Sequence, residues 1–88
     1  MKYSLSSQCS KQIDKIKSRD ETLYKKIKIK LKIFAEDPNH RSLRIHKLSG
    51  SQADSWSISV DMSVRMLFYY SDESVIFFAV GEHNQVYK

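Results

Sequence analysis

Two histidines stand beside residues that can bind an anion or a base. His83 follows the glycine of "AVGEHNQVYK" and precedes Tyr87 by four residues, while His46 lies in "RIHKLSG", next to Lys47. Imidazole titrates near neutral pH, so either histidine can take up or release a proton. Lysine can bind a phosphate, and tyrosine can stack on a base or donate a hydrogen bond. These segments are candidates for a site, although each histidine also fits an ordinary surface or packing role.

Arg65 is the other residue whose position calls for a partner. It stands between Val64 and Met66 in a stretch that is otherwise apolar, "VRMLFYY". An unpaired charge is costly to bury, so the guanidinium must reach a partner or the edge of a sheet. The partner is either a carboxylate of the chain (Asp61, Asp72 or Glu73) or a phosphate presented in a groove.

The motifs of several other site classes are missing from the sequence. Gly50 and Gly81 are the only glycines, so there is no glycine-rich nucleotide loop, and there is no H-E-x-x-H helix. The single cysteine, Cys9, excludes an internal disulfide and a cysteine-rich zinc site. Two histidines far apart in sequence are weak evidence for a metal. We therefore expect neither a metal nor another cofactor.

The charge balance points to a polyanionic partner. Lys and Arg number 15 against 10 Asp and Glu, which gives a net charge of +5. Such a balance favours nucleic acid, an acidic protein or an anionic membrane, although a basic surface can also serve solubility alone.

Length and hydropathy bound the architecture. The 88 residues predict one domain spanning 1–88. No stretch of about 20 apolar residues is present, which argues against a membrane span. The start "MKYSLSSQCS" lacks the apolar region of a signal peptide. A single cysteine fits a reducing compartment, so we expect a cytoplasmic protein.

The first 36 residues predict a short strand and two helices. Residues 2–5 fit a strand. The segment 6–18 places Cys9, Ile13 and Ile16 on one helical face, with Ser6 or Ser7 as the N-cap. Ser18 or Asp20 can cap a second helix over 20–36, which the Asp37-Pro38 pair ends.

The second helix contains a misleading pattern. "KIKIKLKI" alternates strictly, as a strand does, but the wider window places an apolar stripe on one helical face. That stripe consists of Leu23, Tyr24, Ile27, Leu31, Phe34 and Ala35. Ile29 and Ile33 form a smaller patch that either packs on the first helix or docks a partner.

The rest of the chain predicts a loop and three strands. "EDPNHRSLRIHKLSG" reads as a basic loop in which His40 is simply exposed. Strands follow at 56–60, 64–70 and 74–80, joined by short turns as an antiparallel meander, with Trp56 in the core. The expected fold is α+β: two N-terminal helices packed on a small twisted antiparallel sheet, in the order β-α-α-β-β-β.

Several of these segments together resemble the RelE/ParE superfamily of bacterial type II toxins. The resemblance runs from "FAEDPNHRSLRIHKLSG" through "WSISV" and "VRMLFYY" to "VGEHNQVY", which is nearly the whole chain. It implies a small RelE-like toxin domain that a cognate antitoxin protein neutralises. RelE-like members are ribosome-dependent endoribonucleases that cut mRNA in the ribosomal A site, whereas ParE-like members poison DNA gyrase.

The resemblance also implies site residues. Arg65 falls on the RelE-type arginine of the middle strand and Tyr87 on the C-terminal tyrosine. His83 and His46 match histidines of the YafQ-like branch. The chain departs from RelE where that toxin has alternating lysines, because Ser57 and Ser59 stand there. A second YafQ-type histidine and aspartate have no clear counterpart, although Asp61 lies close.

These residues suffice for RNA cleavage without a metal. A base must deprotonate the 2′-hydroxyl, cations must stabilise the charge on phosphorus, and an acid must protonate the 5′-oxygen. We assign acid and base roles to His46 and His83, with Arg65 as a catalytic cation and Tyr87 as a stacking or leaving-group residue. RNA and phosphate binding falls to Arg41, Arg44 and Lys47. The alternatives are a ParE-like gyrase inhibitor and a non-toxic binding module.

Overall fold

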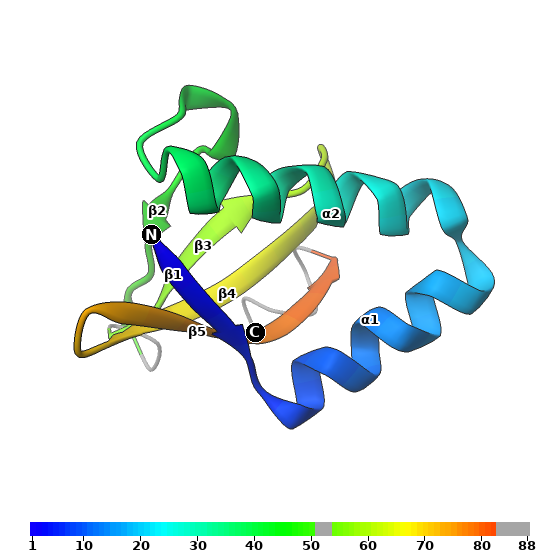
Figure 1. Cartoon of the computed structure of the whole chain (residues 1–88), viewed down its shortest axis with the longest axis horizontal. Helices are drawn as coiled ribbons and strands as arrows, with labels where there is room; N and C mark the ends of the chain where they lie inside the picture. The colour runs from blue at the N-terminus through cyan, green and yellow to red at the C-terminus, as the bar shows by residue number, and fades with distance from the viewer. Residues whose placement is uncertain (51–53, 83–88) are drawn as a thin grey trace.

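A five-stranded sheet carries two helices on one face (Figure 1). The computed structural model describes residues 1–50 and 54–82. The elements in chain order are β1 (Lys2–Leu5), α1 (Ser7–Arg19), α2 (Glu21–Glu36), a 3-10 turn (Arg41–Leu43), β2 (His46–Lys47), β3 (Trp56–Ser59), β4 (Val64–Ser71) and β5 (Ser74–Glu82). The predicted α+β fold and the order of its main elements are confirmed.

The strand order in space is β1-β5-β4-β3-β2. Strands β2 to β5 pair antiparallel, as the meander predicts. The first strand, β1, pairs parallel with β5, so the sheet is mixed rather than wholly antiparallel. A parallel neighbour needs a long crossover, and the two helices between β1 and the meander supply it.

Both helices begin at the residues that the sequence offers as caps. The Ser6 hydroxyl accepts a hydrogen bond from the Cys9 N–H at 3.1 Å, so Ser6 rather than Ser7 is the N-cap of α1. The Asp20 carboxylate accepts from the Leu23 N–H at 3.0 Å at the start of α2. Each contact satisfies a backbone donor that the first helical turn leaves without a partner.

The period of α2 is helical, as the wider window predicts. Ile27, Leu31 and Phe34 are buried, whereas Ile29 is 57% exposed. Ile33 packs against the core, so the small patch divides: one isoleucine supports the fold and the other faces solvent.

The core lies between the helices and one face of the sheet. The Phe34 ring of α2 lies edge-on to Phe68 and Phe77, with ring centroids 5.3 Å apart in both pairs. From α1, Cys9 and Ile13 belong to the same cluster. Trp56 is half-buried and packs against it, in accord with its predicted core role. We call this side of the sheet the helix face and the opposite side the far face.

A short strand lies inside the predicted loop. His46 and Lys47 form β2 by pairing with Ser57 and Trp56 of β3. Arg44, just before it, adopts a left-handed backbone conformation (φ 46°) that turns the chain toward the sheet edge. His40 is exposed as predicted, and its Nδ1 accepts from the Ser42 N–H at 3.1 Å to cap the 3-10 turn.

Candidate functional site

The register of the sheet places His46 and Arg65 on the far face. His46 is paired with Ser57, and Arg65 is paired with Ser59. Directly paired residues point to the same side, as do residues two apart along one strand. Because Ile58 and Met66, the alternate partners in the same ladder, are buried in the core, the other four point away from the helices.

His46 and Arg65 are close enough for one nucleotide. His46 lies on β2 and Arg65 on β4, two strands away, and Arg65 is displaced by two residues along β4 from the position level with His46. With the usual strand spacing and rise, their Cα atoms are about 12 Å apart. His46 is exposed and Arg65 is half-buried. A gap of this size can hold a ribose and its phosphate, so both side chains can contact one nucleotide.

The guanidinium of Arg65 forms no ion pair or hydrogen bond within the described residues. The three carboxylates considered as partners lie elsewhere. Asp72 and Glu73 are in the turn between β4 and β5, at the other end of β4. The Asp61 carboxylate contacts Lys26 of α2 at 3.7 Å. Within this part of the chain, Arg65 is therefore available to an anion from outside.

The Asp61 carboxylate accepts hydrogen bonds within its own turn, between β3 and β4. Its Oδ1 accepts from the N–H groups of Ser63 and Val64 at 2.9 and 2.8 Å. Burial alone would raise the pKa of this carboxyl, but the two N–H groups and the nearby Lys26 ammonium outweigh burial and lower it. A carboxylate held in this way is a poor proton acceptor near neutrality, so Asp61 does not replace the missing YafQ-type groups.

Far-face positions carry positive or neutral side chains. Within the described strands they include Lys2, His46, Ser59, Arg65 and Tyr69, and none of them is Asp or Glu. Glu82 is paired with Val64, whose side chain belongs to the core on the other side. The far face is thus suited to a negatively charged ligand.

Lys47 lies on the opposite side from His46. Its Nζ sits 5.8 Å from the ring centroid of Trp56, on the helix face. The two residues are neighbours in sequence, and a strand sends successive side chains to opposite faces. Arg41 and Arg44 are exposed in the segment that leads into β2, at the edge of the sheet next to His46. His83 and Tyr87 lie outside the described residues.

Sequence reasoning missed an aromatic pair on the far face. Tyr69 is 39% exposed, and its ring lies 5.7 Å from that of Phe78 at an interplanar angle of 41°. Tyr69 shares strand β4 and the far face with Arg65, four residues away. The sequence signal for this pair is the alternation in "VRMLFYY". Val64, Met66 and Phe68 belong to the core, so the residues between them, Arg65 and Leu67, and the next one, Tyr69, point to the far face.

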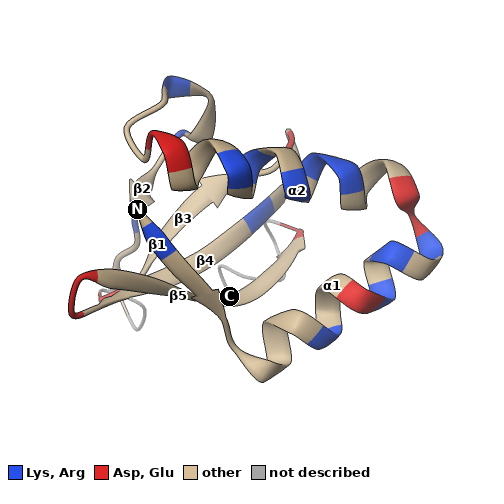
Figure 2. Cartoon of the chain, in the orientation of Figure 1, with Lys and Arg blue, Asp and Glu red and all other residues tan. Residues whose placement is uncertain are grey.

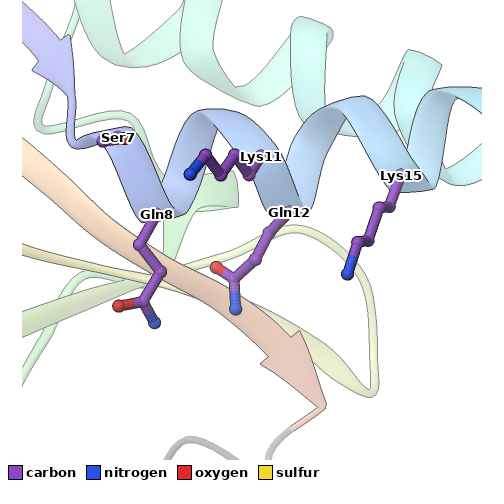
Figure 3. A pocket seen from close by; sticks show the side chains of 5 residues that line it. All are labelled: Ser7, Gln8, Lys11, Gln12 and Lys15. Atoms are coloured by element: carbon purple, nitrogen blue, oxygen red, sulfur yellow. The ribbon is translucent and has the colours of Figure 1, made fainter.

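A hollow lies along α1, apart from the far face (Figure 3). It measures about 500 Å³ and is lined by residues of one helix, namely Ser7, Gln8, Lys11, Gln12 and Lys15. The Gln12 side-chain oxygen accepts from the Val80 N–H at 2.9 Å, which ties α1 to β5. The lining is polar and basic but offers no histidine or thiol for catalysis.

Other kinds of site find no support in the described part of the chain. No group of three or more His, Cys, Asp or Glu side chains there is placed to hold a metal ion. Cys9 is fully buried, and burial raises the pKa of its thiol to about 11, so it is not a nucleophile at neutral pH. None of the described helices has the length and hydropathy to cross a membrane.

Comparison with known proteins gives matches by structure but none by sequence. No family model and no curated protein matches the chain. YafQ from E. coli strain BL21(DE3) superposes with a TM-score of 0.80 at 17% identity, over 99% of this chain and 98% of YafQ. A YoeB/ParE toxin from Agrobacterium tumefaciens gives 0.77 at 16% identity, over 94% and 99% of the two chains.

A third match is the heterotetrameric YoeB–YefM toxin–antitoxin complex from Staphylococcus aureus. It has a TM-score of 0.76 at 17% identity and covers 94% of this chain and 97% of the matched one. At such identities the likeness establishes the fold. The chain has the fold of the YafQ and YoeB/ParE toxins, which is the fold that its resemblance to the RelE/ParE superfamily implies.

Proposed function

We propose that this protein is the toxin of a type II toxin–antitoxin system and that it cleaves mRNA on the far face of its sheet. The observation that carries the proposal is the placement of His46 and Arg65. An exposed imidazole and a guanidinium with no ion pair in the described residues share one face, on which no described strand position is acidic. The fold shared with YafQ and with YoeB of a toxin–antitoxin complex supports the toxin role.

The proposed reaction needs only groups of the chain and the RNA. His46 takes the proton of a ribose 2′-hydroxyl, and the 2′-oxygen attacks the adjacent phosphorus. Arg65 stabilises the extra negative charge on the phosphoryl oxygens as the new bond forms. The bond to the 5′-oxygen then breaks, which leaves a 2′,3′-cyclic phosphate and a 5′-hydroxyl.

The assignments of His83 and Tyr87 depend on the sequence resemblance. We assign His83 to protonate the departing 5′-oxygen, and Tyr87 to stack on a neighbouring base or support the leaving group. Both residues belong to the segment that follows β5. The last two residues of β5, Gly81 and Glu82, pair with Arg65 and Val64 of β4.

Substrate binding is assigned to the edge of the sheet near β2. Arg41 and Arg44 are exposed there and contribute positive charge along the path that an RNA strand takes to His46. Lys47, on the helix face, contributes to the field around this edge rather than to the phosphate between His46 and Arg65.

The proposed target is mRNA on the ribosome, and the proposed inhibitor is an antitoxin protein. We propose that cleavage occurs in the ribosomal A site, which places the protein in the cytoplasm, and that a cognate antitoxin protein inhibits it. Structural neighbours of this chain include toxins in complex with the antitoxins DinJ and YefM. The second candidate function is gyrase inhibition, because one neighbour is a YoeB/ParE toxin. Such an inhibitor would not need His46 as a proton-transfer group.

Controlled expression separates the two functions. The wild-type chain, His46→Gln and the control His40→Gln are induced, growth is followed, and the 5′ ends of cellular mRNA are mapped. The ribonuclease proposal expects growth arrest and new mRNA ends with the wild type and His40→Gln, and neither with His46→Gln. Arrest that persists in His46→Gln with DNA damage and without new mRNA ends would favour the gyrase inhibitor.

A further inference from the structure

The excess positive charge of this chain lies on its helices, away from the proposed cleavage face. Helices α1 and α2 contain nine of the 15 Lys and Arg residues but only three of the 10 Asp and Glu, a net charge of +6. The net charge of the whole chain is +5, so everything outside the helices sums to −1. Figure 2 shows basic residues repeated along both helices. The far face alone does not account for the basic character of the protein.

Lys25, one of the five lysines of α2, pairs with Glu21 at 3.5 Å, and the other four divide into two groups by their contacts. Lys26 and Lys30 turn toward the body of the protein: Lys26 lies 3.7 Å from Asp61, and the Lys30 ammonium donates to the Ser42 carbonyl oxygen at 2.8 Å. Lys28 and Lys32 are exposed, and neither forms an ion pair within the described residues. The second group is free to contact a partner.

The Tyr24 ring makes cation–π contacts with one lysine of each helix. Lys17 of α1 and Lys28 of α2 each place an ammonium 5.5 Å from the centroid of its ring. The ring therefore holds two positive charges of different elements at one position, although like charges repel. We call the exposed set Lys17, Lys28 and Lys32 the lysine ridge.

We propose that the lysine ridge docks the protein on the phosphate backbone of a folded, double-stranded RNA. Lysine is depleted in protein–protein interfaces, which are centred on aromatic and apolar anchors, and Ile29 is the one large apolar residue exposed on α2. Spaced ammonium groups without apolar anchors instead suit the phosphates of a duplex, which are read by charge and shape.

This docking surface rests on the proposed function and gives the far face a separate partner. The ridge and the far face lie on opposite sides of the sheet, because the helices pack only against the core side. A molecule held by its helices on duplex RNA keeps His46 and Arg65 free for a single strand. The inference therefore assigns folded RNA to the helices and the cleaved strand to the sheet.

The test compares two double variants of one helix that remove the same charge. Lys28→Gln/Lys32→Gln neutralises two ridge lysines, whereas Lys26→Gln/Lys30→Gln neutralises the two that face the body. Glutamine has a helix propensity close to that of lysine, so α2 is kept. Binding of each purified variant to a short, fluorescently labelled RNA duplex is measured across a salt series, and thermal unfolding confirms that each one is folded.

The proposal expects the ridge variant to weaken duplex binding and to make the slope of log K against log salt shallower by about two. The body-facing variant should retain the slope of the wild type. Equal losses in both variants would show that only net charge matters and overturn the assignment, as would no loss in either. A ridge variant that keeps duplex affinity but loses affinity for a glutamate-rich peptide probe would assign the ridge to an acidic protein instead.

Cleavage is read separately, so the two proposals can fail independently. His46→Gln should keep duplex binding and lose cleavage of mRNA. If no form of the protein cleaves RNA while the ridge variant still loses duplex binding, the ribonuclease proposal fails and the docking surface stands. If cleavage occurs but the ridge variant binds duplex as the wild type does, the docking surface is wrong.

Discussion

His46 and Lys47 are consecutive residues of β2, yet the sheet places them on opposite faces. His46 shares the far face with Arg65, and the Lys47 ammonium lies 5.8 Å from the ring centroid of Trp56 on the helix face. The proposed reaction therefore expects the two residues to differ in their effect on the cleavage rate. His46→Gln should slow RNA cleavage by about 10²–10⁴-fold, since it removes the base. Lys47→Gln should leave the rate within about threefold, because an exposed charge on the other face of the sheet acts only weakly through water.

Single-turnover cleavage of a purified mRNA on ribosomes measures both variants. Equal losses in the two would mean that the face of the sheet does not decide the role, and would remove the main support for the far face as the site.

Substitution of Arg65 should affect the cleavage rate much more than the stability of the fold. Arg65→Gln should lower the cleavage rate by about 10²–10³-fold, the usual effect of removing one group that stabilises developing charge. Because the Arg65 guanidinium has no ion pair or hydrogen bond among the described residues, the same change should alter the free energy of unfolding by less than about 0.5 kcal/mol. Urea denaturation measures the second quantity. A loss of several kcal/mol would instead indicate a structural partner for the guanidinium.

Much of this arrangement was predictable from local sequence. The apolar stripe that includes Ile27, Leu31 and Phe34 predicts α2 as a helix despite the alternating "KIKIKLKI", because only a helical period brings these three residues together in the core. Ser6 and Asp20 are effective caps wherever the helices pack, so their roles also follow from the sequence. The three meander strands are recognisable because their turns are short.

Non-local features were not predictable. The parallel pairing of β1 with β5 joins Lys2 to Ser74, and no local pattern encodes so distant a partner. The two-residue β2 carries no period of its own and exists only through its pairing with β3. The face occupied by His46 depends on that register, since a shift of one residue would exchange it with Lys47. The sequence therefore named His46 and Lys47 as candidates without dividing them between the faces.

Tyr69 and Tyr70 allow an adjacent-residue test of base stacking. Tyr69 is on the far face beside Phe78, whereas Tyr70 packs on Trp56 and Phe68 with ring centroids 5.7 Å apart. If the RNA strand stacks a base on Tyr69, Tyr69→Ala should raise the KM for cleavage by about 5–100-fold. Tyr70→Ala should leave KM unchanged and lower the free energy of unfolding by about 1 kcal/mol through its lost aromatic pairs. Unchanged KM in Tyr69→Ala would exclude stacking there.

Asp61 should make the fold sensitive to acid. Its pKa is lower in the folded chain than its ordinary value of 3.8, so it contributes stability above that pH and loses it as the pH falls through the folded pKa. Asp61→Asn keeps an oxygen for the Ser63 and Val64 N–H groups but removes the charge that faces Lys26. The difference in urea midpoint between neutral pH and a pH below 3.8 should therefore be smaller in Asp61→Asn than in the wild type. Asp72→Asn, in the turn between β4 and β5, is the control and should retain the acid sensitivity of the wild type. Equal sensitivity in all three proteins would mean that the hydrogen bonds and the Lys26 contact do not lower the pKa of Asp61 relative to the unfolded chain.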